Sequence, residues 1–131
     1  MGSEFTFYDY VDGEGDNAIR TFLGGLDPKP RAKFNRNLLA LSGLPIAEWD
    51  WPLVGLLTDH CAGLFEIRVS LQRVHHRILG SHLGEQGKAT LLYCFTKRTR
   101  RVEEAECDRA FVRWDEILAE PETRRLEHRY D

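Results

Sequence analysis

The residues best suited to chemistry lie in one stretch of the chain, residues 68–101. This stretch has eight basic side chains and a single acid, Glu85, so its net charge is +7. It also holds three of the five histidines, His75, His76 and His82. The basic residues are Arg68, Arg73, Arg77, Lys88, Lys97, Arg98, Arg100 and Arg101. A surface of this composition would attract a phosphate backbone.

Arginine and histidine together also suit the cleavage of RNA by its own 2′-hydroxyl. That reaction needs a group to take the 2′-hydroxyl proton, a group to protonate the leaving 5′-oxygen, and fixed positive charge beside the phosphorus. Histidine, with an unperturbed pKa of about 6.5, can do the first two, and the planar fork of arginine does the third. A solvated basic edge without catalysis has the same composition, so both interpretations stay open.

The rest of the chain is acidic. Residues 1–67 and residues 102–131 each have five basic and ten acidic side chains, which brings the net charge of the 131 residues to −3. That total alone would argue against a nucleic-acid partner, but the local balance is the more informative quantity. With 42% hydrophobic and 30% charged residues, the chain has the composition of one globular domain rather than of a disordered or fibrous protein.

The cysteines, the apolar runs and the spacing of possible metal ligands limit where the protein can act and what it can bind. The three cysteines, Cys61, Cys94 and Cys107, form no CxxC pair, so we expect neither a disulfide framework nor structural zinc, and a cytoplasmic location. No apolar run approaches the roughly 18 residues of a membrane span. His60 has no partner cluster with ligand spacing, so we expect no metal and no cofactor. The opening residues, MGSEF, are either native or partly a remnant of cloning.

The first part of the chain predicts a strand and two helices. Residues 5–11 are aromatic and β-branched, which favours a short strand. Asp16 or Asn17 can cap a helix whose apolar residues up to Leu26 have helical spacing. A second helix is expected at 30–41. Residues 44–63 show no clean period and predict a partly buried connection, in which Trp49 and Trp51 are more typical of packing than of base stacking.

Three strands and a helix follow. Residues 64–71 alternate between apolar and polar, a strand near 73–79 follows a turn at Gln72, and a third strand is expected at 90–96 after the turn at 84–87. A helix over 102–119 has an apolar stripe and ends at Pro121. We therefore predict an α+β fold in one domain, residues 5–120, with a small, mainly antiparallel sheet, helices packed on one face and a polar tail at 121–131.

The predicted sheet gathers the basic residues. Alternation puts Arg68, Arg73, His75 and Arg77 on the exposed face of two neighbouring strands, and Lys97 and Arg98 at the end of the third, before Arg100 and Arg101. A structural alternative exists for each: Arg68 and Arg77 could pair with Glu66 across the strands, and Lys97 and Arg98 could be a solvated strand end. His76 alternates toward the core.

Several short stretches resemble the phage-derived HigB-like toxins of the RelE/ParE superfamily. The resemblance covers about residues 5–118 and keeps the order of the predicted elements. The matching stretches are Phe7-Tyr8, Gly15, Ile19 to Leu26, Glu66-Ile67-Arg68, His76-Arg77-Ile78-Leu79, Leu91-Leu92, Phe95-Thr96-Lys97, and Glu106 with Ala110 and Arg113.

This resemblance implies a RelE-like fold and a type II toxin, a ribosome-dependent endoribonuclease that cleaves mRNA without a metal and is silenced by an adjacent antitoxin. Arg77 matches the arginine that faces the scissile phosphate, and Arg68 and the pair Lys97-Arg98 match basic residues of the flanking strands. We assign catalysis to Arg77, His75, Lys97 and Arg68. We assign RNA binding to Arg73, Arg98, Arg100 and Arg101.

The chain also departs from the family pattern. His76 stands where relatives often have tyrosine, Gly80 stands where they have an aromatic residue, and the last helix has no tyrosine near its start. The general acid and base are therefore open. The alternatives are a ParE-like gyrase inhibitor and a catalytically degenerate binding protein. The expected partners are mRNA on the ribosome and an antitoxin with a helix-turn-helix; no membrane partner is expected.

Overall fold

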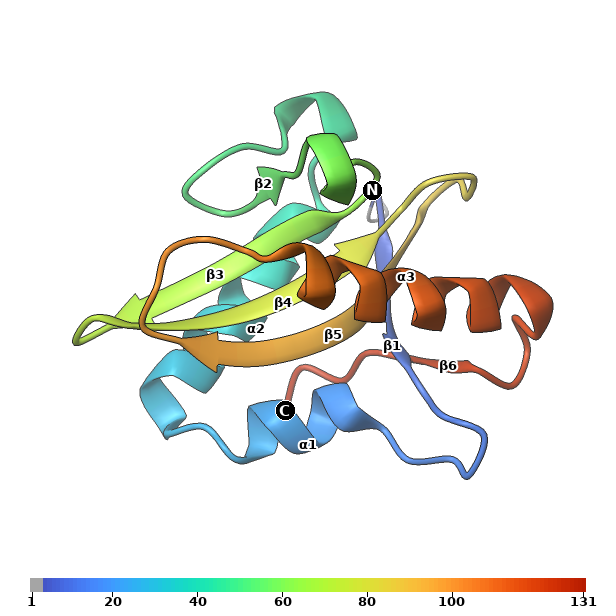
Figure 1. Ribbon diagram of the computed structural model, residues 1–131, viewed down its shortest axis with the longest axis horizontal. Coiled ribbons are helices and arrows are strands. Elements are labelled where there is room, and N and C mark those ends of the chain that lie inside the picture. The colour runs from blue at the N-terminus through green and yellow to red at the C-terminus, as the bar shows by residue number, and fades with distance from the viewer. Residues whose placement is uncertain (1–3) are drawn as a thin grey trace.

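One mixed sheet runs through the computed structural model, which describes residues 4–131 (Figure 1). The strands are β1 (Thr6–Tyr10), β2 (Gly55–Leu56), β3 (Phe65–Leu71), β4 (Val74–Ser81), β5 (Lys88–Lys97) and β6 (Arg125–Glu127). They lie in the order β2-β3-β4-β5-β1-β6. The central strands β3, β4 and β5 are antiparallel, whereas β1 runs parallel to β5. The cloning remnant considered for the first residues lies mostly outside the described residues.

The hairpin of β3 and β4 has the alternation of faces that the sequence predicts, although Arg73, expected in the second strand, lies in the turn. Its two turn residues, Gln72 and Arg73, have φ angles of 52° and 66°. Positive φ at both positions is the mark of a type I′ turn, whose twist matches that of the flanking strands. Ile67 therefore pairs with Ile78 on the core face, and Arg68 pairs with Arg77 on the other.

Three helices complete the chain: α1 (Ala18–Gly24), α2 (Pro28–Ser42) and α3 (Glu104–Ala119). The side chain of Asn17 accepts a hydrogen bond from the Arg20 amide at 2.9 Å, as expected of an N-cap. Glu103 and Glu106 form a capping box at the start of α3. The connection at 44–63 is partly buried, as predicted, and contains β2 and two single 3₁₀ turns, Ile46–Glu48 and Asp59–Cys61.

The prediction that the helices pack on one face of the sheet is wrong. In Figure 1, α2 lies behind the sheet, α1 lies below it on the β5 side, and α3 crosses in front of it. The reason is that the second face is also partly apolar: Leu79 and Leu92 are fully buried against Ala110 and Trp114 of α3. A sheet with apolar side chains on both faces needs helices on both.

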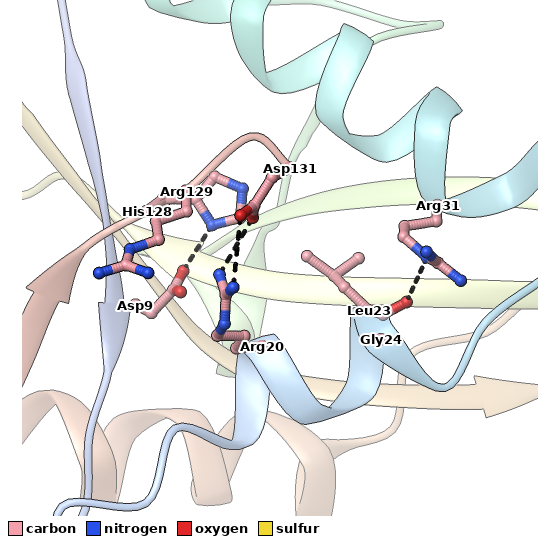
Figure 2. Close-up of a pocket in the computed structure, with 8 residues that line it drawn as sticks. All are labelled: Asp9, Arg20, Leu23, Gly24, Arg31, His128, Arg129 and Asp131. Carbon is pink, nitrogen blue, oxygen red and sulfur yellow. Dashed lines mark hydrogen bonds and ion pairs between the residues drawn. The ribbon is translucent and has the colours of Figure 1, made fainter. Parts of the chain in front are cut away.

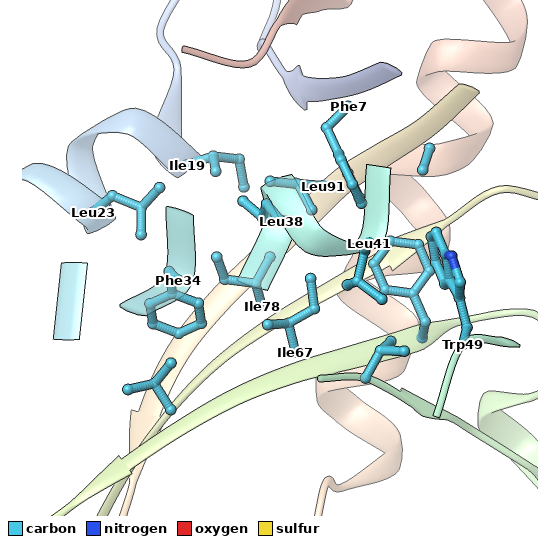
Figure 3. Close-up of a cluster of buried hydrophobic side chains, with 14 residues drawn as sticks. Phe7, Ile19, Leu23, Phe34, Leu38, Leu41, Trp49, Ile67, Ile78 and Leu91 are labelled. Atoms are coloured by element: carbon cyan, nitrogen blue, oxygen red, sulfur yellow. The ribbon is translucent and has the colours of Figure 1, made fainter. Parts of the chain in front are cut away.

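The larger core lies between the sheet and the helices α1 and α2 (Figure 3). Phe34, Leu38 and Leu41 of α2 project onto Ile67 and Ile78. Trp49 is 4% exposed and stacks on Phe7, so its predicted packing role is confirmed. Trp51 instead lies on the surface.

The polar tail predicted at 121–131 also needs correction. Residues 125–127 form β6, which pairs antiparallel with β1. Arg125 is buried and holds Glu85 through two contacts of 2.6 Å, and His128 is buried against Asp9. The sequence did not reveal this strand, because the charged partners that bury Arg125 and His128 lie 40 and 119 residues away along the chain.

A disulfide joins Cys61 to Cys107, contrary to the prediction from cysteine count. The two residues are 46 positions apart, and only the fold brings the 3₁₀ turn at 59–61 next to α3. Among the described residues, Cys94 is the cysteine that forms no disulfide. Within residues 4–131, no helix has the length and apolar character needed to cross a membrane.

Candidate functional site

The predicted catalytic residues form two neighbouring rows across β3, β4 and β5. Arg68 pairs with Arg77 in the first row, and Ser70, His75 and Lys97 form the second. The rows share the sheet face on which α3 packs. The structure therefore brings Arg68, Arg77, His75 and Lys97 together as expected, but it covers much of the face that the sequence predicted to be exposed.

Arg77 is the most deeply buried member, with 0% of its side chain exposed. Its Nε lies 2.8 Å from Glu66 Oε2, although their alignment does not meet the geometry of a hydrogen bond. Its Nη1 donates to the Arg101 carbonyl at 3.4 Å, and its Nη2 has no partner among the described residues. The alternative of a structural ion pair with Glu66 is thus present in the structure.

Glu66 is buried next to two arginines, and its burial disfavours the charged carboxylate. Burial raises the pKa of Glu66, and the nearby charges of Arg68 and Arg77 offset part of that rise. Arg68 lies at the border of the site: its Nε is 3.8 Å from Glu66 Oε2, and its guanidinium stacks 4.7 Å from the ring centre of Trp51. Arg68 is therefore partly accessible, unlike Arg77.

His75 has the environment of a neutral imidazole. Burial lowers the pKa of His75, and the positive charges of Arg77, Arg68 and Arg100 lower it further. Its Nδ1 lies 2.6 Å from the hydroxyl of Ser70, which orients the ring and leaves Nε2 for another group. A neutral, oriented histidine among cations is suited to accept a proton near a phosphate.

Lys97 is bound to the start of α3. Its Nζ lies 2.5 Å from Glu106 and 3.4 Å from Glu103. The hydrogen bond to Glu106 raises the pKa of Lys97, so this ammonium stays charged and is suited to electrostatic stabilisation rather than to proton transfer. The ion pair of Lys97 with Glu106 also joins the end of β5 to the capping box of α3.

The four residues assigned to RNA binding form an exposed basic rim beside these rows. Arg73 lies in the turn between β3 and β4, and the other three lie in the loop from β5 to α3. Because His75 pairs with Lys97, the turn and the loop emerge at the same end of the sheet (Figure 1). None of the four makes an ion pair within residues 4–131. The basic rim is Arg73, Arg98, Arg100 and Arg101.

The other histidines of the basic segment lie apart from this face. His76 points to the opposite face, where its Nδ1 contacts Thr96 at 2.9 Å. His82 packs among aromatic rings. No cluster of three or more histidine, cysteine, aspartate or glutamate side chains suited to a metal occurs in the described part of the chain. His60 instead pairs with Asp108 at 2.6 Å.

A polar pocket of about 360 Å³, apart from the rows of basic side chains, was not predicted (Figure 2). Asp9 and His128 meet there, with His128 Nδ1 2.8 Å from Asp9 Oδ1 and His128 Nε2 2.9 Å from Asn35 Oδ1. Arg20 holds Asp131 across the mouth at 3.1 Å. Both ring nitrogens of His128 are engaged, so the cluster anchors the end of the chain rather than presenting a free base.

Comparison with known proteins places the chain in a family. No curated protein and no solved structure matches it significantly. A family model described as Phage derived protein Gp49-like (DUF891) matches residues 21–115. The match runs from within α1 to within α3 and includes both rows of basic side chains and the basic rim. Because it covers more than half of the chain, the protein belongs to the phage-derived Gp49-like family.

Proposed function

We propose that this protein is the toxin of a type II toxin–antitoxin system and cleaves mRNA on the ribosome. The observation that carries the proposal is the position of His75, a histidine with a lowered pKa next to Arg68 and beside the four unpaired arginines of the basic rim. Membership of the Gp49-like family and the resemblance to HigB-like toxins support it. The cytoplasm, where ribosomes lie, is the corresponding location.

The basic rim would bind the RNA backbone and bring a phosphate to Arg68. His75 Nε2 would take the proton of the 2′-hydroxyl while the 2′-oxygen bonds to phosphorus. The bond from phosphorus to the 5′-oxygen then breaks, and the leaving oxygen takes a proton from water. Lys97 and Arg68 would stabilise the charge that builds on the phosphate.

Arg77 would act here as a positioning residue. It is fully buried, so it does not reach a bound phosphate in this arrangement. Its charge helps to lower the pKa of His75, and its pairing with Glu66 fixes the sheet beneath the site. We therefore assign the contact with RNA to Arg68 and the basic rim.

The test is expression in a bacterium with primer extension on translated mRNA. We expect growth arrest and cuts within codons of the ribosomal A site, both lost in His75→Ala. His76→Gln is the matched control, because His76 lies on the opposite face. Cuts that persist in a folded His75→Ala variant would refute the assignment of His75. Arrest with no cut in any mRNA would refute the nuclease proposal.

One observation favours a second candidate, a RelE-fold protein that binds its partners without catalysis. The arginine expected to face the phosphate is buried against Glu66, and His75, the one proton acceptor among the assigned residues, is itself only 9% exposed. Such a protein would cause neither cuts nor arrest. The ParE-like alternative would cause arrest without cuts, together with loss of gyrase supercoiling activity.

A further inference from the structure

The second half of β5 has a free edge. Strand β1 pairs with β5 from Lys88 to Leu91, whereas β5 continues to Lys97. After Asp9 the chain of β1 turns away, and the Val11 amide donates to the Arg124 carbonyl at 2.9 Å. In Figure 1, β1 accordingly lies beside the right-hand end of β5, and the left-hand half of β5 has no strand on that side.

The hairpin geometry shows which backbone groups face this edge. A two-residue turn makes Leu71 and Val74 a hydrogen-bonded pair, and the pattern alternates along the strands. His75 and Arg77 therefore bond with β5, through Lys97 and Phe95. The residues between these partners, Cys94 and Thr96, must direct their N–H and C=O groups outward.

An observed contact agrees with this assignment. The carbonyl of Leu92, two residues before Cys94, accepts a hydrogen bond from Arg113 Nη1 at 2.8 Å. A side chain thus supplies the donor that a neighbouring strand would have supplied. In the described structure, no backbone or side-chain group forms a hydrogen bond with the outward N–H or C=O groups of Cys94 or Thr96.

At the free edge, Cys94 lines a cleft of about 510 Å³. The wall on the α1 side consists of Asp16, Asn17, Ala18, Thr21 and Phe22, the wall on the α3 side is Arg113, and β5 contributes Tyr93 and Cys94. A strand added at the usual spacing of about 4.8 Å from β5 would lie between these walls. Its side chains would point alternately toward α1 and toward α3.

The two walls differ in chemistry. On the α3 side, Arg109 donates to the Tyr93 hydroxyl at 2.6 Å and Arg113 stacks on Tyr10 and Tyr93, yet neither arginine has a carboxylate partner within residues 4–131. The two acids beside them on α3 are already engaged, Asp108 with His60 and Glu116 with Arg124 and the Tyr10 hydroxyl. On the α1 side, Phe22 is a half-buried aromatic surface.

We propose that the free edge of β5 binds an extended segment of a partner protein by strand addition, with acidic side chains toward Arg109 and Arg113 and apolar side chains toward Phe22. The backbone groups of Cys94 and Thr96 supply the main-chain hydrogen bonds, and the two walls select the alternating pattern. This proposal does not depend on nuclease activity, because the binding edge lies outside the rows that hold His75.

The first test uses twelve-residue peptides selected from a phage-displayed random library on the intact protein. We expect peptides that alternate apolar and acidic residues. Thr96→Pro removes the outward N–H and should weaken their binding at least about tenfold. Thr96→Val is the matched control, because it also removes the side-chain contact with His76 but keeps the N–H. Equal binding by both variants, or selection of no such peptide, overturns the proposal.

Hydrogen exchange tests the edge without a substitution. The amides of Cys94 and Thr96 should exchange much faster than those of Tyr93 and Phe95, and a bound peptide should slow them at least tenfold. Protection of Cys94 and Thr96 in the free protein overturns the proposal.

Charge and oligomeric state complete the test. Arg109→Glu should weaken peptide binding, whereas Arg36→Glu, an exposed change on α2, should not. Equal effects of the two changes would contradict the acidic preference. A second copy of this chain could also pair through this edge. If sedimentation shows a dimer that Thr96→Pro separates, the occupant is that second copy and the assignment to a different partner is wrong.

Discussion

The guanidinium of Arg77 and the carboxylate of Glu66 form a buried ion pair, with 2.8 Å between Nε and Oε2 and at most 5% of either side chain exposed. This pair lies beneath the start of α3, on the sheet face that holds Arg68, His75 and Lys97. It makes Arg77 a part of the core, so any loss of function on changing Arg77 must be separated from loss of stability.

Removal of one partner of this pair should destabilise the fold strongly. Arg77→Met leaves the Glu66 charge buried alone, and we expect the free energy of unfolding to fall by about 3–5 kcal/mol. The double change Glu66→Met with Arg77→Met should recover at least half of that loss, because no charge is then left unpaired. Urea unfolding of the single and double variants measures both. A decrease below about 1 kcal/mol in Arg77→Met would show that the pair is not structural.

His82 should make the fold sensitive to mild acid. Its ring lies 5.8 Å from Trp49 and 6.5 Å from Phe65, and burial lowers the pKa of His82 below its ordinary value of 6.5. The unfolded chain then binds the proton first, so the free energy of unfolding should decrease as pH falls from about 6.5 through the lower pKa of the folded state.

Unfolding by urea between about pH 7.5 and pH 5 checks this effect. His82→Phe should reduce the loss of stability over this range, and Arg129→Gln, an exposed change in the C-terminal segment, should not. His75 and His76 also have lowered pKa values, so part of the acid sensitivity should remain in His82→Phe. An unchanged pH dependence in His82→Phe would contradict the prediction.

The disulfide between Cys61 and Cys107 should contribute about 3–4 kcal/mol to stability, because it closes a loop of 46 residues in the unfolded chain. Replacement of both cysteines by alanine should lower the free energy of unfolding by that amount. Dithiothreitol should lower the stability of the unchanged protein to the same level, and should leave the double variant unaffected. Equal stability with and without the reductant would show that the bond does not form in solution.

The basic rim should control the salt dependence of RNA binding. For single-stranded RNA, the slope of log K against log salt should decrease by about 0.7 for each phosphate that the protein no longer neutralises. Arg98→Gln combined with Arg100→Gln should therefore reduce the slope by about 1.4, and Arg36→Gln, on the exposed surface of α2, should not change it. Filter binding of a short RNA across about 50–300 mM salt measures the slope. An unchanged slope in the double variant would place the RNA elsewhere.

The sequence alone was enough for most of the elements and for which side chains share a face of a strand. Local periodicity predicted β1, α1, α2 and α3, and the alternation at 64–71 correctly separated Ile67 from Arg68. These features depend on neighbours a few residues away, so the local sequence pattern is enough to predict them. The structure explains the glycine at position 80, because a Cβ there would lie 2.4 Å from the Phe65 ring.

What surrounds those faces was decided by tertiary structure. Placing α3 on the second face buried Arg77, brought Glu106 to Lys97, and set Cys107 beside Cys61. The last residues, polar when taken alone, became β6 through charged partners such as Glu85 for Arg125.

The basic charge of residues 68–101 was thus determined by the sequence, since charge belongs to side chains wherever they lie. Which of those charged side chains are exposed to solvent was decided only by packing. A cationic side chain on a strand is exposed or buried according to the element that covers the strand, and that element comes from distant parts of the chain. For this protein α3 is the covering element, and it divides the predicted site into a buried pair at Arg77 and an accessible basic rim.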